Sequence, residues 1–266
     1  MKKKSGMEKR EKEKKQEFFK LGIPGFDDLV HPGIPEGTSN LVEGGPGSGK
    51  TIFCLNVGMN ACKRGKRVLY MSFEEPESRL RSHLKNFGLN TEEYEKKGLL
   101  YIKRFNALDI ARSVEALLSE AKKELFIDVQ PILIPPEFKP DIVLIDSLSS
   151  IASAFAGEES RFRIYMEQLF RYLENHEITS FLIRETANPT HIGATFIEKG
   201  EAVSFLSDGI IAIYNVLFEN SKRGRALEII KLRGIDIKRQ IVECDVGKNG
   251  FVVYPNRIIK GSYKLT

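Results

Sequence analysis

Residues 39–56 read SNLVEGGPGSGKTIFCLN, a short apolar run that passes through a glycine-rich turn into a segment of helical pattern. Within it, residues 44–51 match GxxxxGK[ST], which binds phosphate when a strand precedes it and a helix follows. The glycines let the backbone curl until successive N–H groups point at one anion, at the positive end of the helix dipole. The stretch therefore predicts a nucleotide site with a strand and a helix on either side.

The loop predicts a role for each of its residues in binding ATP. The expected phosphate contacts come from seven consecutive residues: Gly45, Pro46, Gly47, Ser48, Gly49, Lys50 and Thr51. Lys50 would also act in catalysis by reaching the β- and γ-phosphates, and the Thr51 hydroxyl would ligate Mg²⁺. The alternative is a glycine-rich turn without a ligand.

A magnesium site needs an acidic residue on a neighbouring strand, and Asp146 ends the apolar run IVLI of residues 142–145. There its carboxylate would lie beside Thr51 and complete the metal site. The alternative for Asp146 is a cap on the following turn, a common role of aspartate.

Glu74 and Glu75 follow the apolar run RVLYMSF of residues 67–73. Because ligands bind at the carboxyl ends of parallel strands, both carboxylates are expected near the phosphates, where one would act as general base on water. The alternative is that both only begin the helix at Pro76, since glutamate and proline suit a first turn.

Strand patterns alternate with helix patterns through most of the chain, which predicts an α/β fold with a parallel sheet covered on both faces. The expected strands are 39–43, 67–73, 99–104, 141–146 and 178–184, and the expected helices are 50–64, 76–87, 91–97, 109–124 and 158–175. The last part differs, because 209–216, 226–232, 239–245 and 250–254 are strand patterns joined by short turns, which predict antiparallel hairpins. Residues 18–38 are expected to be rich in turns, and the four prolines of 126–140 indicate an irregular insertion.

The positive charge belongs to one end of the chain. Residues 2–15 carry eight Lys or Arg and three Glu, so 33 basic and 33 acidic residues remain of the 41 and 36 in the whole chain. Residues 1–17 are therefore predicted to be a solvated, disordered arm, and 18–266 one folded domain. The alternative for the arm is a weak contact to nucleic acid or an acidic membrane.

The cysteines and the apolar runs indicate the compartment. Cys54, Cys62 and Cys244 have no CxxC spacing, so neither a zinc site nor a disulfide framework is expected. No run of about 18 apolar residues could span a bilayer. A cytoplasmic protein without membrane contact is predicted.

The chain resembles the single-domain members of the KaiC-like branch of the RecA ATPase superfamily. The resemblance lies in GIPGFDDLV (22–30), GIPEG (33–37), the phosphate loop, SFEEP (72–76), IDSL (145–148), SDG (207–209), KLRG (231–234) and GFVVYP (250–255). It implies a RecA-like three-layer sandwich, hexameric rings with ATP at the subunit interfaces, and the paired glutamates as the element that activates water. Lys231 and Arg233 would then reach the γ-phosphate of a neighbouring subunit's ATP. The alternative for these two is a solvent-facing position on a strand.

The chain departs from the family pattern at three points. KaiC has two such domains, and this chain has one. A histidine that often follows KLRG is absent from IDIKRQ (235–240). Where one KaiC domain is phosphorylated, only Ser204 could accept phosphate here, so autophosphorylation is not expected.

The segment 185–206 corresponds to the region that lines the ring centre in RecA relatives. Its only expected cations are Lys199 and a partly charged His191, and the segment also carries Glu185, Glu198 and Glu201, so DNA binding is expected to be weak or absent.

The leading hypothesis is a ring-forming, magnesium-dependent ATPase whose nucleotide state regulates or scaffolds an unidentified protein partner. The alternatives are a DNA-handling ATPase of the RadA or RadB kind, and a nucleotide-binding module without turnover.

Overall fold

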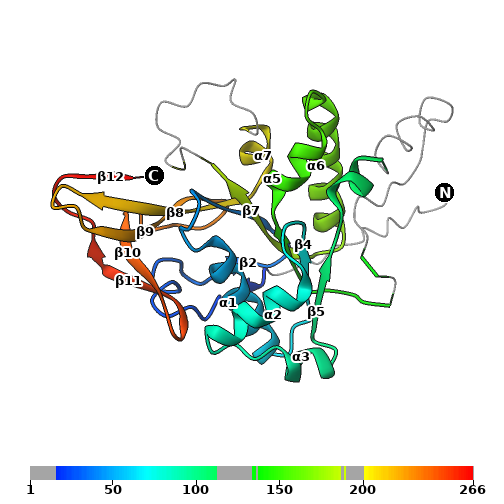
Figure 1. Ribbon diagram of the computed structural model, residues 1–266, viewed down its shortest axis with the longest axis horizontal. Coiled ribbons are helices and arrows are strands. Elements are labelled where there is room, and N and C mark those ends of the chain that lie inside the picture. The colour runs from blue at the N-terminus through cyan, green and yellow to red at the C-terminus, as the bar shows by residue number, and fades with distance from the viewer. Residues whose placement is uncertain (1–15, 113–133, 136, 187–188, 190–200, 266) are drawn as a thin grey trace, which may run out of the picture.

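The computed structural model describes residues 16–112, 134–135, 137–186, 189 and 201–265 (Figure 1). Residues 1–15 of the predicted arm lie outside the described residues, as do residues 113–124 of the predicted helix 109–124 and most of the predicted insertion 126–140. The helical turn at 107–112 is the described beginning of that helix.

A parallel sheet forms the centre of the molecule. Its strands, in spatial order, are β8 (Gly209–Phe218), β3 (Ser39–Gly44), β7 (Thr179–Glu185), β6 (Ile142–Asp146), β4 (Val68–Ser72) and β5 (Leu100–Arg104). All five residues of β4 and of β6 are buried, as expected for strands covered on both faces. Because the strands are parallel, β3, β4, β6 and β7 all end at the same edge of the sheet.

The sheet continues beyond β8 with antiparallel strands, as the sequence predicts. Strand β9 (Arg223–Leu232) pairs with β8, β10 (Val242–Gly247) with β9, and β11 (Gly250–Ile258) with β10. A further strand, β12 (Tyr263–Leu265), pairs with the other edge of β8 and was not predicted.

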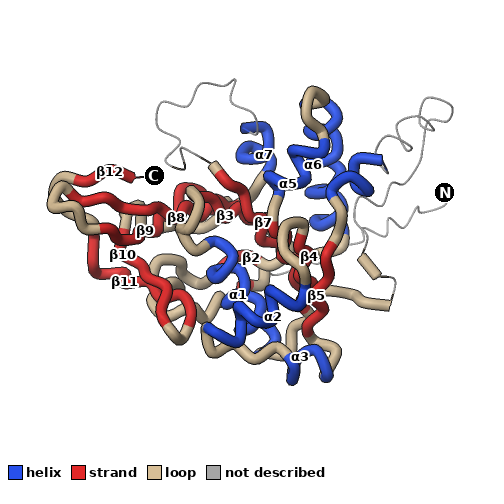
Figure 2. The backbone as a smooth tube through the Cα atoms, viewed as in Figure 1, coloured by secondary structure: helices blue, strands red, loops and turns tan. Residues whose placement is uncertain are grey.

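Helices cover both faces of the sheet and give the predicted three layers (Figures 1 and 2). One face carries α1 (Lys50–Lys63), α2 (Glu77–Asn86) and α3 (Glu92–Lys96), and the other carries α5 (Leu148–Ala154), α6 (Glu159–Asn175) and α7 (Glu201–Leu206). Each face has its own apolar cluster, which buries the side chains that alternate along the strands.

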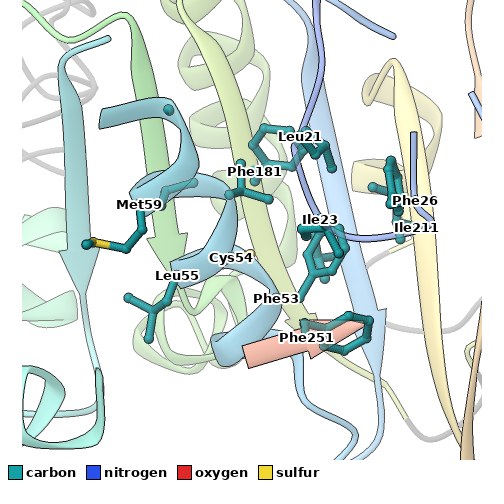
Figure 3. Packing of buried hydrophobic residues seen from close by; sticks show 14 of the residues in the cluster. Leu21, Ile23, Phe26, Phe53, Cys54, Leu55, Met59, Phe181, Ile211 and Phe251 are labelled. Carbon is teal, nitrogen blue, oxygen red and sulfur yellow. The ribbon is translucent and has the colours of Figure 1, made fainter. Parts of the chain in front are cut away.

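Helix α1 is the centre of the first apolar cluster (Figure 3). The ring of Phe53 makes edge contacts with Phe26 of the lead-in, at 5.6 Å between centroids, and with Phe251 of β11, at 5.3 Å. The lead-in itself contains the short pair β1 (Phe18–Phe19) and β2 (Ile34–Pro35). These contacts fix the start of α1, and therefore the phosphate loop, against two distant parts of the chain.

Candidate nucleotide site

The predicted phosphate loop connects β3 to α1, which is the context that its mechanism requires. Gly49 stands at the helix start with φ 108°, in the left-handed region. A Cβ at this position would also lie 3.0 Å from Val246 of β10, so the loop needs glycine both for its turn and for its packing.

Lys50 lies at the base of the loop and is only 6% exposed. Its Nζ donates a hydrogen bond to the Gly45 carbonyl at 2.9 Å and lies 3.7 Å from Glu185 Oε1. Burial lowers the pKa of Lys50, and the nearby carboxylates of Glu185, Asp146 and Glu74 oppose that decrease. The ammonium thus stands where a bound phosphate group would neutralise it.

Thr51 and Asp146 meet as predicted. The Thr51 hydroxyl donates to Asp146 Oδ2 at 2.9 Å, and the buried Tyr70 hydroxyl donates to the same oxygen at 2.6 Å. Burial raises the pKa of Asp146 to about 6, against the opposing effect of these two hydrogen bonds.

The donor set at this point fits magnesium. A hydroxyl and a single carboxylate are hard oxygen ligands, and Mg²⁺ is held by one or two carboxylates together with substrate phosphates. Among the described residues, no group of three or more His, Cys, Asp or Glu could hold a metal ion.

The structure separates the two glutamates that the sequence pairs. Glu74 lines the cleft beside the phosphate loop, where its Oε1 accepts hydrogen bonds from Ser147 at 2.5 Å and Ser150 at 3.1 Å. Glu75 is directed to α2, with Oε2 3.2 Å from Nδ1 of His83. The geometry therefore brings Glu74 to the site and directs Glu75 away from it.

A cleft of about 290 Å³ joins these residues on the carboxyl edge of the sheet. Its lining includes Lys50, Thr51, Glu74, Asp146, Glu185 and Arg225. Glu185 was not predicted as a site residue, although it ends β7 just as Asp146 ends β6, and the same argument from strand ends would have found it.

The antiparallel strands support the tip of the phosphate loop. Asn215 of β8 donates to the Pro46 carbonyl at 3.1 Å, and Arg225 of β9 lies 3.4 Å from the Gly47 carbonyl. Arg225 also pairs with Asp245 of β10 at 3.1 Å. No sequence motif indicates these contacts, because they depend on how the hairpins pack against the loop.

Lys231 and Arg233 lie at the end of β9 and bind α7 of their own chain. Lys231 Nζ donates to the Ser207 carbonyl at 2.5 Å and to the Ser204 carbonyl at 3.1 Å. Arg233 donates to the Phe205 carbonyl at 3.0 Å and pairs with Asp208 at 3.2 Å. Cations suit the carbonyls at the end of a helix.

Two other predictions concern the same region. The Ser204 hydroxyl oxygen is buried and has no hydrogen-bond partner among the described residues, whereas Phe205 beside it is 61% exposed. The predicted loop cations His191 and Lys199 lie outside the described residues.

No helix in the described ranges is long and apolar enough to cross a membrane.

Comparisons with known proteins agree with this geometry. The model of the KaiC ATPase family matches residues 19–258. The chain is 28% identical over 248 residues to a UPF0273 protein of Pyrococcus horikoshii, covering 91% of this chain and 95% of that one. It is 27% identical to the circadian clock protein KaiC3 of Synechocystis, covering 90% of this chain but only 46% of KaiC3.

A crystal structure of a KaiC-like protein from Pyrococcus horikoshii superposes with a TM-score of 0.71 at 28% identity. The superposition covers 90% of this chain and 100% of that protein's chain. These matches favour the KaiC branch over the RadA or RadB alternative.

Proposed function

Because this chain belongs to the KaiC family of ATPases, we propose that it binds ATP with Mg²⁺ and hydrolyses it as one subunit of a ring, with a hexamer as the expected assembly. The observation that supports this most directly is the meeting of Lys50, Thr51, Asp146 and Glu74 around one cleft. Those four side chains come from three separate segments of the sequence, and each is of the type that phosphoryl transfer requires.

The residues divide the work of hydrolysis. The loop amides and Lys50 would hold the β- and γ-phosphates, while Thr51 and Asp146 would hold the metal. Bound Mg²⁺ would supply positive charge to the phosphate oxygens. Glu74 orients a water and accepts its proton as the water oxygen bonds to the γ-phosphorus and the bond to the bridging oxygen breaks.

The site would be completed by the next subunit. Charge spreads over the phosphoryl oxygens in the transition state, and an inserted cation stabilises that state. We assign this role to Lys231 of β9 and to Arg233, the residue that follows β9. The family resemblance implies it, and neither residue lines the cleft of its own chain. Within their own chain, Lys231 and Arg233 donate to carbonyls of α7 and of Ser207, which follows it.

The nucleotide state would control the docking of a protein partner. The chain outside residues 2–15 carries equal numbers of acidic and basic residues, which does not favour a nucleic-acid partner. The thiols of Cys54, Cys62 and Cys244 are free and buried, which suits work in the cytoplasm. Capture of partners by a Glu74→Gln variant that retains ATP would identify the protein that recognises this state.

The test of the site uses matched variants. Lys50→Ala should weaken ATP binding about a hundredfold, because it removes a charged contact to the phosphates, whereas Lys63→Ala on the same helix should not. Glu74→Gln should leave ATP affinity intact and lower kcat about a hundredfold. Glu75→Gln should have the smaller effect.

Titration with labelled ATP and a phosphate-release assay measure both quantities. Unchanged ATP affinity in Lys50→Ala would remove the phosphate-loop assignment. Full turnover in Glu74→Gln would show that another group positions the water.

A further inference from the structure

Helix α5 begins with serines that face the site. Ser147 follows Asp146 directly, is fully buried, and caps α5 by accepting the Ser150 N–H at 3.3 Å. The Ser147 hydroxyl then donates to Glu74 Oε1 at 2.5 Å, and the Ser150 hydroxyl donates to the same oxygen at 3.1 Å. One turn of helix therefore both follows the metal ligand and holds the carboxylate.

We propose that Ser147 and Ser150 are positioning residues, which hold Glu74 in the orientation that serves the attacking water. This inference rests on the proposed function, since it assumes that Glu74 is the base. It assigns to Ser147 and Ser150 a role that the sequence did not indicate.

We call the hydrogen bonds from Ser147 and Ser150 to Glu74 the clamp, and the position of Glu74 explains why it is needed. Its side chain is exposed at the mouth of the cleft and, as a long side chain, would otherwise occupy several rotamers. Both serine hydroxyls donate to Oε1, so they restrain the orientation of the carboxylate, and Oε2 is the oxygen that would contact the water. A catalytic group held in one geometry contributes more to the rate than one that must first be ordered.

The direction of the hydrogen bonds supports this reading. Because Ser147 Oγ accepts a backbone N–H from the first turn of α5, its own proton is directed elsewhere, to Glu74. The bonds run in series from the Ser150 N–H through the Ser147 hydroxyl to Glu74, and bonds in series strengthen one another. The start of α5 thus fixes Asp146 and Glu74 with the same turn.

The experiment compares Ser150→Ala, Ser147→Ala and the double variant with Ser153→Ala. Ser150→Ala removes one bond to Glu74 and keeps the cap, because the cap uses the Ser150 backbone. Ser153 is the control, since it lies on the same helix and its hydroxyl donates to the Ser149 carbonyl. Ser150→Thr keeps the hydroxyl and should restore the rate.

The expected result is a fall in kcat of about fivefold for Ser150→Ala and about thirtyfold for the double variant, from the loss of bonds to a charged group. KM for MgATP and the affinity for ATP should stay within about twofold, because neither serine holds phosphate. Thermal unfolding of each variant separates these effects from the loss of the α5 cap.

The outcomes separate this inference from the proposed function. If the native chain releases no phosphate, or if Glu74→Gln turns over normally, the proposed function is wrong. If Glu74→Gln stops turnover while the double serine variant keeps its kcat, the clamp is wrong and Glu74 remains the base. A parallel loss of ATP affinity and kcat would also refute the clamp, since it would show that the serines support binding.

Discussion

Asp146 shows how a residue suited to metal binding acts against stability. Burial raises the pKa of its carboxyl from its ordinary value of 3.8 to about 6. The folded protein therefore favours the protonated carboxyl. The stability that this group contributes is complete below the pKa that it has in the unfolded chain, and is lost as the pH rises through about 6. At neutral pH the ionised carboxylate lowers the free energy of unfolding by about 3 kcal/mol.

Asp146→Asn should therefore stabilise the protein without nucleotide, while it weakens the binding of MgATP. The amide oxygen can still accept from Tyr70 and Thr51. We expect a gain of about 3 kcal/mol at pH 7.5 that shrinks to about half that value at pH 5. Urea unfolding of both proteins at the two pH values measures it, and a gain that does not change with pH would refute the ionisation argument.

The residues of the site were predicted to different degrees. Lys50, Thr51 and Asp146 follow from a motif and from the end of a strand, and the structure brings all three together. The different directions of Glu74 and Glu75 could not be predicted, because they depend on tertiary contacts. Glu74 is held by Ser147, which is distant in the sequence, and Glu75 by His83 on α2.

At the scale of elements, the join between β3 and β8 carries a constraint that comes from packing. A Cβ on Gly44 would lie 2.1 Å from the Ile213 carbonyl oxygen and 2.7 Å from the Ser48 hydroxyl. The strand and the phosphate loop would have to move apart to admit it. Strand β3 must therefore end in glycine before the loop begins.

Gly44→Ala should lower the free energy of unfolding by about 3 kcal/mol, as overpacking does in a dense interior, and should also weaken ATP binding. Gly247→Ala in β10 is the control, because a Cβ there meets open space. Urea unfolding and ATP titration of the two variants provide the comparison. Equal stabilities would show that the strands yield without cost.

The alternation of strand and helix patterns along the sequence made most elements predictable. Helix α5 and strand β12 were not predicted, and each has a physical reason. The sequence predicts β4 and β6 within a residue or two, because their apolar runs are uninterrupted. Helix α5 is short and rich in serine, which favours turns and caps over helix interiors. Strand β12 has three residues, and its pairing with β8 is decided by the tertiary fold.

At the scale of the whole molecule, a ring whose sites are shared between neighbours allows complementation. Glu74→Gln has an inactive cleft and keeps both cations, Lys231 and Arg233, whereas Arg233→Ala has an intact cleft and lacks one cation. In a ring with head-to-tail contacts, an Arg233→Ala subunit beside a Glu74→Gln subunit forms one complete site.

An equal mixture of Glu74→Gln and Arg233→Ala should therefore recover about a quarter of the native turnover, because two random choices must both be right. Phosphate release before and after mixing measures the recovery, and the mass in solution with ATP checks the assembly. The sum of the two separate activities, with rings present, would contradict a shared site.

The grip of Lys231 and Arg233 on α7 has a consequence for how subunits communicate. Both side chains donate to carbonyls of their own α7, and under the proposed arrangement the γ-phosphate of a neighbouring subunit would compete for the same donors. ATP binding in one subunit would then weaken the two contacts that hold the end of α7 in the adjacent subunit. The occupancy of one site would therefore be transmitted around the ring in one direction, from each subunit to its neighbour, through the end of α7.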